Sequence, residues 1–229
     1  MLVARRGNGP IGGWFWAAVA LSLVVSLTPW APFILYPFKL FTTWVHESSH
    51  ALMTVLVGGR VTSIAIQPDT SGVTQSLVPT GRIARGLVAS AGYLGAAVVG
   101  CLLIASLRVE KWGQVILLSL GALMLLTLVL WMRNLFGAAI VLAWGVALIT
   151  LAWKGVANAL RFFLSLLAIQ VALNAVYDIR VLFLIDRGQS DAATMAQLFL
   201  LPSWMWATTW MLMSVAMLGA TLWMTRARR

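Results

Sequence analysis

Residues 40–57 of the chain read LFTTWVHESSHALMTVLV, an apolar stretch that contains His46, Glu47 and His50. Its length approaches the roughly 20 residues that a helix needs to cross a bilayer. His46 and His50 are the only two histidines of the sequence, and residues four apart lie on one face of a helix. Two imidazoles at this spacing can bind one zinc ion, and the carboxylate beside them can act as a general base on its water.

The position of Glu47 in an apolar stretch favours this interpretation over chance. An unpaired charge at the centre of a bilayer costs about 2.5–3.5 kcal/mol on insertion scales, and the chain has only six Asp and Glu residues. Core packing does not explain why one of them lies between the two histidines. A metal ion in a water-filled pocket does, so we predict zinc ligated by His46 and His50, with Glu47 as the catalytic base.

The composition places the whole chain in a membrane. Of 229 residues, 61% are hydrophobic and 10% are charged, whereas soluble domains have about 25% charged residues. The net charge of +10 comes from basic residues that stand singly between apolar runs. That distribution is typical of lipid-headgroup contacts and excludes a nucleic-acid-binding surface. The single cysteine, Cys101, excludes an internal disulfide.

The apolar runs predict an all-α integral membrane protein with about six to seven transmembrane helices in one transmembrane domain, residues 1–229. The first run follows two arginines and is expected to be retained as a span. The histidines belong to the second, a metal-site helix at about 38–57, and a late helix covers about 160–185. Orientation and oligomeric state stay open. The apolar runs are 14–30, 40–57, 83–107, 115–132, 135–153, 160–185 and 203–224.

A short β-hairpin is predicted directly after the metal-site helix, at about residues 59–80. Gly58 and Gly59 can end the helix in a left-handed conformation. Residues 61–66 and 73–78 alternate as strands do, and PDTSG at 68–72 is a turn signal. The alternative is an ordinary surface loop.

These features resemble the site-2 proteases, intramembrane zinc metalloproteases of peptidase family M-50, and their small multi-span bacterial branch in particular. The matching parts are the stretch from His46 to Leu52, the two glycines after it, the β-rich insert, the glycine-rich run 91–95 and a late span with Asn174 and Asp178. The family's late motif has a glycine directly after its aspartate, whereas Ile179 follows Asp178 here. The resemblance implies hydrolysis of peptide bonds in membrane-protein or peptide substrates, in a bacterial cell membrane.

Asp178 is the predicted third zinc ligand, because a catalytic zinc needs three protein ligands and an open position. It is flanked by long apolar sequence on both sides. His50 lies eight residues before Gly58, and Asp178 lies at a similar distance from the end of a helix that runs in the same direction, which gives both a depth of about 12 Å. The alternatives are pairing of Asp178 with a nearby arginine, or ligation by Cys101 or Asp191. Asp191 is expected to cap a short helix together with the preceding serine.

Asn174 lies one helical turn before Asp178 and is predicted to stabilise the oxyanion of the reaction; an interhelical hydrogen bond is the alternative. The sequence as a whole predicts an intramembrane zinc metalloprotease. A catalytically inactive scaffold of the same family and an ion or metal transporter are the alternative functions. A transporter is expected to show paired repeats, and the chain has no convincing internal repeat.

Overall fold

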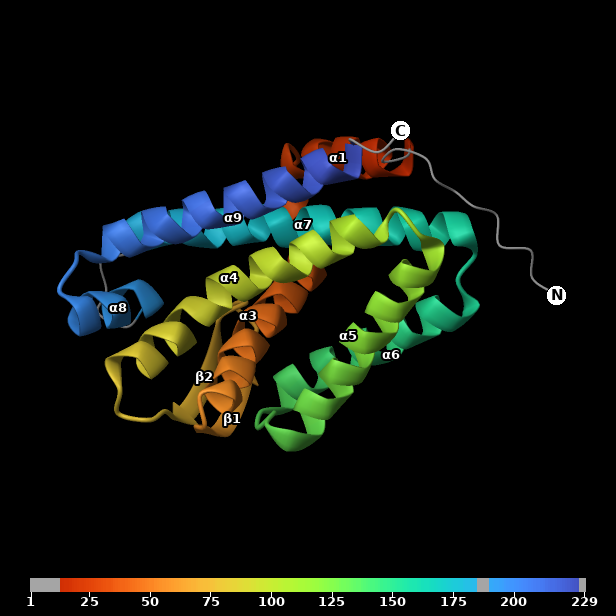
Figure 1. The fold of residues 1–229 in the computed structure, drawn as a ribbon. Helices are drawn as coiled ribbons and strands as arrows, with labels where there is room; N and C mark the ends of the chain where they lie inside the picture. Colours follow the sequence, from red (N-terminus) through yellow and green to blue (C-terminus); the bar gives the residue numbers. More distant parts are fainter. Residues whose placement is uncertain (1–12, 185–189, 227–229) are drawn as a thin grey trace.

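The computed structural model describes residues 13–184 and 190–226, except for the side chains of 110, 175–184 and 226. Figure 1 shows a bundle of helices with one small hairpin of strands. The elements are α1 (Gly13–Ser26), α2 (Ala31–Ile34), α3 (Tyr36–Leu56), β1 (Arg60–Ile66), β2 (Gly72–Leu77), α4 (Arg82–Ser106), α5 (Glu110–Leu130), α6 (Leu135–Lys154), α7 (Ala157–Leu184), α8 (Asp191–Phe199) and α9 (Ser203–Arg226).

The helices confirm the predicted class of an integral, multi-pass membrane protein. Within the described residues, five helices are long and apolar enough to cross a bilayer: α4, α5, α6, α7 and α9. The apolar helix α1 has only 14 residues. The metal-site helix α3 has 21 residues but is not among the five, because it contains several polar residues.

Helix α3 lies inside the bundle, which is why polar residues are tolerated on it. Leu40, Phe41, Trp44 and Val45 are buried in the main hydrophobic core. The indole Nε1 of Trp44 donates a hydrogen bond to Thr127 Oγ1 of α5 at 2.9 Å, in the protein interior. Protein side chains, and not lipid, therefore surround much of α3.

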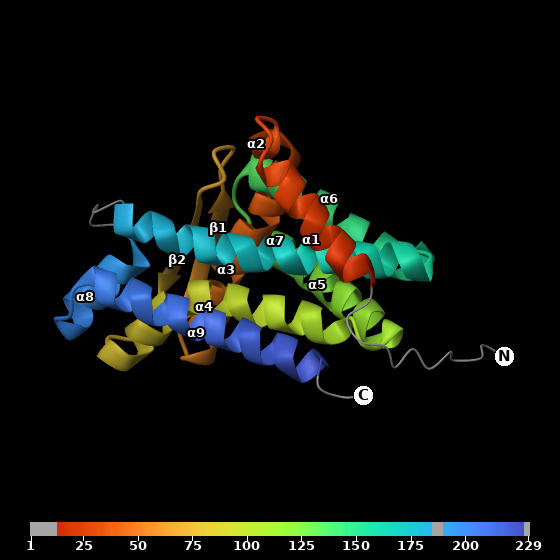
Figure 2. The same ribbon diagram turned by 90° about the horizontal axis from the view of Figure 1, so that it is seen from above.

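Helix α4 is the central support of the bundle. It packs against α3, α7, α8 and α9, while α1 packs across α7 (Figure 2). The helices α5 and α6, which cover the apolar runs 115–132 and 135–153, pack side by side with Gly121 and Gly145 at their contact. A Cβ on Gly121 would lie 2.9 Å from the carbonyl oxygen of Gly145. Such close approach is how small residues hold helices together in lipid.

The predicted hairpin is confirmed. β1 and β2 are antiparallel, with Ile64 opposite Thr74 and Ile66 opposite Gly72. Gly58 has a φ of +79°, the left-handed conformation expected after α3. In the turn, hydrogen bonds from the side chain and backbone N–H of Ser71 hold the pKa of Asp69 below its usual value.

The outer edge of β1 is already paired. The N–H of Ile64 donates to the carbonyl of Trp131 at 2.7 Å, and the N–H of Arg133 donates back to Ile64 at 3.1 Å. The side-chain amide of Asn134 bonds both backbone groups of Ile66. The loop between α5 and α6 thus anchors β1 and leaves β2 as the other edge of the hairpin.

Candidate metal centre

The two histidines face one another on the buried side of α3. Their Nε2 atoms are 3.0 Å apart, and their ring planes meet at 76°. Two nitrogen ligands at about 2.0–2.1 Å from a tetrahedral zinc ion lie about 3.3 Å from each other. The spacing predicted from the i and i+4 positions therefore directs both nitrogens at a common point.

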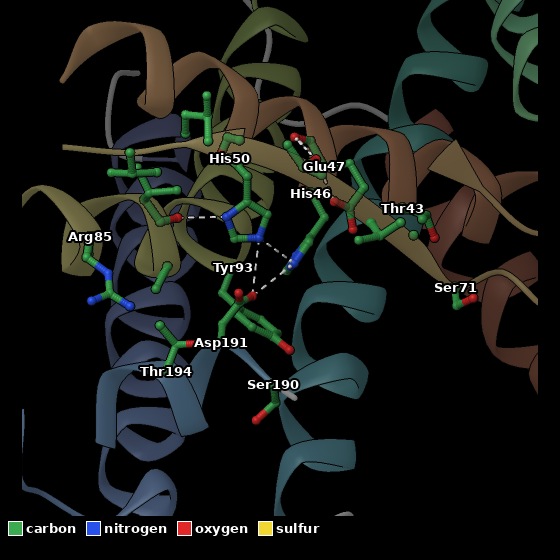
Figure 3. A pocket seen from close by; sticks show the side chains of 18 of the residues that line it. Thr43, His46, Glu47, His50, Ser71, Arg85, Tyr93, Ser190, Asp191 and Thr194 are labelled. Atoms are coloured by element: carbon green, nitrogen blue, oxygen red, sulfur yellow. Dashed lines mark hydrogen bonds and ion pairs between the residues drawn. The ribbon is translucent and has the colours of Figure 1, made fainter. Parts of the chain in front are cut away.

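Asp191 completes a triangle of donor atoms. Its Oδ2 lies 3.2 Å from Nε2 of His46 and 3.2 Å from Nε2 of His50 (Figure 3). This is the group of potential metal ligands found among the described residues. Two imidazoles and one carboxylate, with a side open to water, make up a ligand set known for catalytic zinc.

The hydrogen bonds of the site suit a metal. Nδ1 of His50 lies 2.7 Å from the carbonyl oxygen of Val88, which only accepts, so Nδ1 carries the proton. Nε2 is then the nitrogen that can give up its proton and offer a lone pair to a metal, the usual arrangement for a metal-bound histidine. Burial acts to raise the pKa of Asp191, but hydrogen bonds from His46 and His50 outweigh it and hold the pKa below its usual value. A divalent cation would replace the protons shared among these atoms.

The start of α8 positions Asp191. Ser190 is the N-cap of this helix, and its hydroxyl accepts a hydrogen bond from the N–H of Ala193 at 3.1 Å. This confirms the predicted cap. It also brings the alternative ligand of the sequence analysis to the site, because Asp191, the first residue of the capped helix, lies against both histidines. The segment GQSD at 188–191 resembles an interfacial loop, and no local signal distinguishes it from one.

Helix α4 forms the back wall of the site. A Cβ on Gly92 would overlap the rings of both His46 and His50, so only glycine fits there. The ring of Tyr93 meets His46 edge-on, with centroids 4.8 Å apart, and stacks on Trp210 of α9 at 5.1 Å. The glycine-rich run 91–95 therefore makes room for the imidazoles.

Glu47 lies beside the triangle but is held by the hairpin. It is buried, and its carboxylate accepts a hydrogen bond from Thr74 Oγ1 of β2 at 2.7 Å. A Cβ on Gly72 would lie 2.7 Å from the Glu47 carboxylate, so the strand approaches Glu47 closely. The carboxylate is adjacent to the site without being one of the three grouped ligands, as its predicted role as a base requires.

Two predicted residues have other outcomes. The side chain of Asp178 lies outside the described residues, so its predicted role as a ligand stays a prediction. Asn174 is buried, with Nδ2 3.5 Å from Oγ1 of Thr42 on α3, which is long for a hydrogen bond. Among the described residues that line the cleft, Asn174 is absent. The structure thus shows the interhelical contact, and the oxyanion role stays a prediction.

The site opens into a cleft of about 900 Å³. Helix α3 forms one wall, β2 and the turn before it form a second, and the first turns of α4 together with α8 form the rest (Figure 3). The lining residues are Thr43, His46, Glu47, His50, Thr70, Ser71, Gly72, Val73, Thr74, Ser76, Leu77, Val78, Arg85, Val88, Ala89, Tyr93, Ser190, Asp191 and Thr194.

Comparison with known protein families gives one match. The model of a family described as Peptidase M50B-like matches residues 15–221, which include every element of the site. No curated protein and no solved structure matches the chain.

Proposed function

Because the chain belongs to the Peptidase M50B-like family, we propose that it is an intramembrane zinc metalloprotease that hydrolyses peptide bonds of membrane-associated substrates. The observation that supports this most directly is the triangle of His46, His50 and Asp191, with the buried Glu47 carboxylate beside it. A transporter does not require a carboxylate held next to a metal site and facing a cleft. An inactive relative would not need to keep all four groups together.

In this proposal His46, His50 and Asp191 hold the metal. A zinc ion held there would supply Lewis-acid chemistry, polarising the carbonyl group of the substrate and making a water molecule more acidic. Glu47 would take a proton from the attacking water and later return it to the departing amine nitrogen. The hydroxyl of Thr74 orients the Glu47 carboxylate, because its 2.7 Å hydrogen bond fixes one oxygen.

Metal removal tests this proposal. We expect the protein, reconstituted in lipid nanodiscs, to cleave a transmembrane peptide, to lose that activity on treatment with a chelator and to regain it with zinc. Metal content, measured by mass spectrometry, should be near one zinc per chain. Cleavage that persists in a metal-free sample would contradict the proposal.

The outer edge of β2 is the proposed binding site for the substrate backbone. A helical substrate uses its N–H and carbonyl groups internally, so a segment must unwind before its peptide bonds can react, and the freed groups need new partners. A strand edge supplies them by β-augmentation. The hairpin offers two strands for this role, β1 and β2.

The pairing of β1 favours β2. Ile64 and Ile66 direct their backbone groups away from β2, to residues 131–134. Two residues that lie opposite each other in an antiparallel pair either both direct their backbone N–H and carbonyl groups toward the partner strand or both direct them away from it. Thr74 and Gly72, opposite them, therefore direct their N–H and carbonyl groups away from β1. The described residues that line the cleft include most of β2 and none of β1, so this edge faces the cleft.

A proline on the β2 edge tests this binding mode. Ser76 is two residues after Thr74, so its N–H also points outward, and Ser76→Pro removes that donor. We expect cleavage to fall about fivefold, the equivalent of one hydrogen bond of roughly 1 kcal/mol, with zinc content unchanged. Ser76→Ala, which removes the hydroxyl and keeps the N–H, is the control and should cleave normally. Equal cleavage rates for both variants would show that the β2 edge does not bind the substrate backbone.

A further inference from the structure

We propose that Arg85 selects substrates with a carboxylate about three residues from the scissile bond. The inference rests on the proposed function and names the substrate class of that same cleft. The residues of the cleft follow one another in a definite order. Ser71 and Thr43 lie at one end, Glu47 and the histidines lie between, and Arg85 lies at the other end (Figure 3).

The face of α4 that lines the cleft sets the distance between Arg85 and the metal site. Arg85, Val88, Ala89 and Tyr93 recur at helical spacing, so they lie on one side of α4. Val88 accepts the hydrogen bond of His50, and Gly92 abuts both imidazoles. Arg85 precedes Gly92 by seven residues, which is about 10 Å along a helix. An extended substrate covers that distance in about three residues at 3.3 Å each.

The charges of the cleft indicate the ligand. Arg85 is the only lysine or arginine among the described residues that line it, and it is solvent-exposed. The two acidic residues of that lining have other partners: Glu47 accepts from Thr74, and Asp191 contacts the imidazoles. A guanidinium at the end of a peptide-binding cleft binds a carboxylate through paired N–H donors. Thr194 of α8 also lines the cleft and adds a hydroxyl group to it.

A second arginine supplies a matched control. Arg82 begins α4, one turn before Arg85, and is also exposed, but it is absent from the described lining of the cleft. Both arginines stand near the end of a membrane span, where a basic side chain commonly contacts lipid headgroups. An effect of substituting Arg85 that substituting Arg82 does not reproduce therefore distinguishes substrate selection from headgroup binding.

The test compares two peptides that differ only by Glu or Gln at the third residue from the scissile bond, placed on either side in turn. Both have acetylated and amidated ends, and a third peptide has a free terminal carboxylate at that position. We expect wild type to prefer the Glu peptide by about fivefold in kcat/KM, which is typical of an exposed ion pair. The preference should weaken as salt rises. Arg85→Gln should bring the ratio near one, Arg85→Glu should favour a Lys peptide, and Arg82→Gln should keep the wild-type ratio.

Binding measurements separate this inference from the proposed function. Fluorescence anisotropy of the same peptides on Glu47→Gln protein reports selection without cleavage. A Glu preference in binding that depends on Arg85, together with a wild-type protein that cleaves none of the peptides, would support the selection and refute the protease. Cleavage of Glu and Gln peptides at equal rates by wild type would refute the selection and leave the protease intact. If Arg82→Gln and Arg85→Gln changed the Glu preference equally, Arg85 would be assigned to headgroup binding and the proposal would be overturned. The same conclusion would follow if the effect of Arg85→Gln appeared only with anionic lipid.

Discussion

Glu47→Gln is expected to lower the rate of peptide cleavage by about 10²- to 10⁴-fold while the protein keeps its zinc. Glutamine preserves the size of the side chain and can still accept the hydrogen bond from Thr74, but it cannot take a proton from water. The donor triangle of His46, His50 and Asp191 does not include Glu47, so the metal site stays complete. Single-turnover cleavage and metal content, measured on the same preparation, check the result.

The matched control is Glu110→Gln, a substitution of the chain's other glutamate, at the start of α5. It should leave both cleavage and zinc at wild-type levels. Loss of zinc in Glu47→Gln would show that Glu47 is a ligand and not the base. A wild-type rate in Glu47→Gln would refute the proposed mechanism.

Asp191→Ala is expected to remove most of the bound zinc and, with it, the activity. Asp191 supplies the only negatively charged donor of the triangle, and two neutral imidazoles alone bind a divalent cation much more weakly. The loss should show as a zinc content well below one per chain, measured on protein purified at a defined low zinc concentration. Asp191→Asn should retain a part of the zinc, because its amide oxygen stays in place without the charge.

Two further variants decide between the candidate third ligands. Cys101→Ala should keep its zinc, because Cys101 lines a different groove, between α4 and α9. Asp178→Ala should keep it as well, since His46, His50 and Asp191 already supply the three protein ligands of a catalytic zinc. If Asp178→Ala lost its zinc and Asp191→Ala retained it, the prediction from the sequence would stand and the assignment of Asp191 would fall.

The parts of the protein that could be predicted from sequence depend on neighbours along the chain. A helix places residues four apart on one face, so the pairing of His46 and His50 followed from their spacing. The hairpin followed from alternation and turn residues, and the left-handed Gly58 from its place after an apolar helix. Hydropathy predicted the membrane helices, whereas α3 is too polar to be one of the five apolar spans of the described residues and lies largely within the protein.

The contacts that complete the site depend on residues far apart in the chain, and only the tertiary structure decided them. Asp191 reaches the histidines because α8 packs against α4 beside the site, and a depth argument along single membrane helices does not include a contact from a separate short helix. The same holds for the hydrogen bond between Thr74 and Glu47. Periodicity identifies which face of an element is buried, whereas the partner on that face is set by the packing of several elements at once. The sequence by itself thus determined the membrane class, the histidine pair and the hairpin, and the packing of α8 and β2 onto α3 decided how the site is completed.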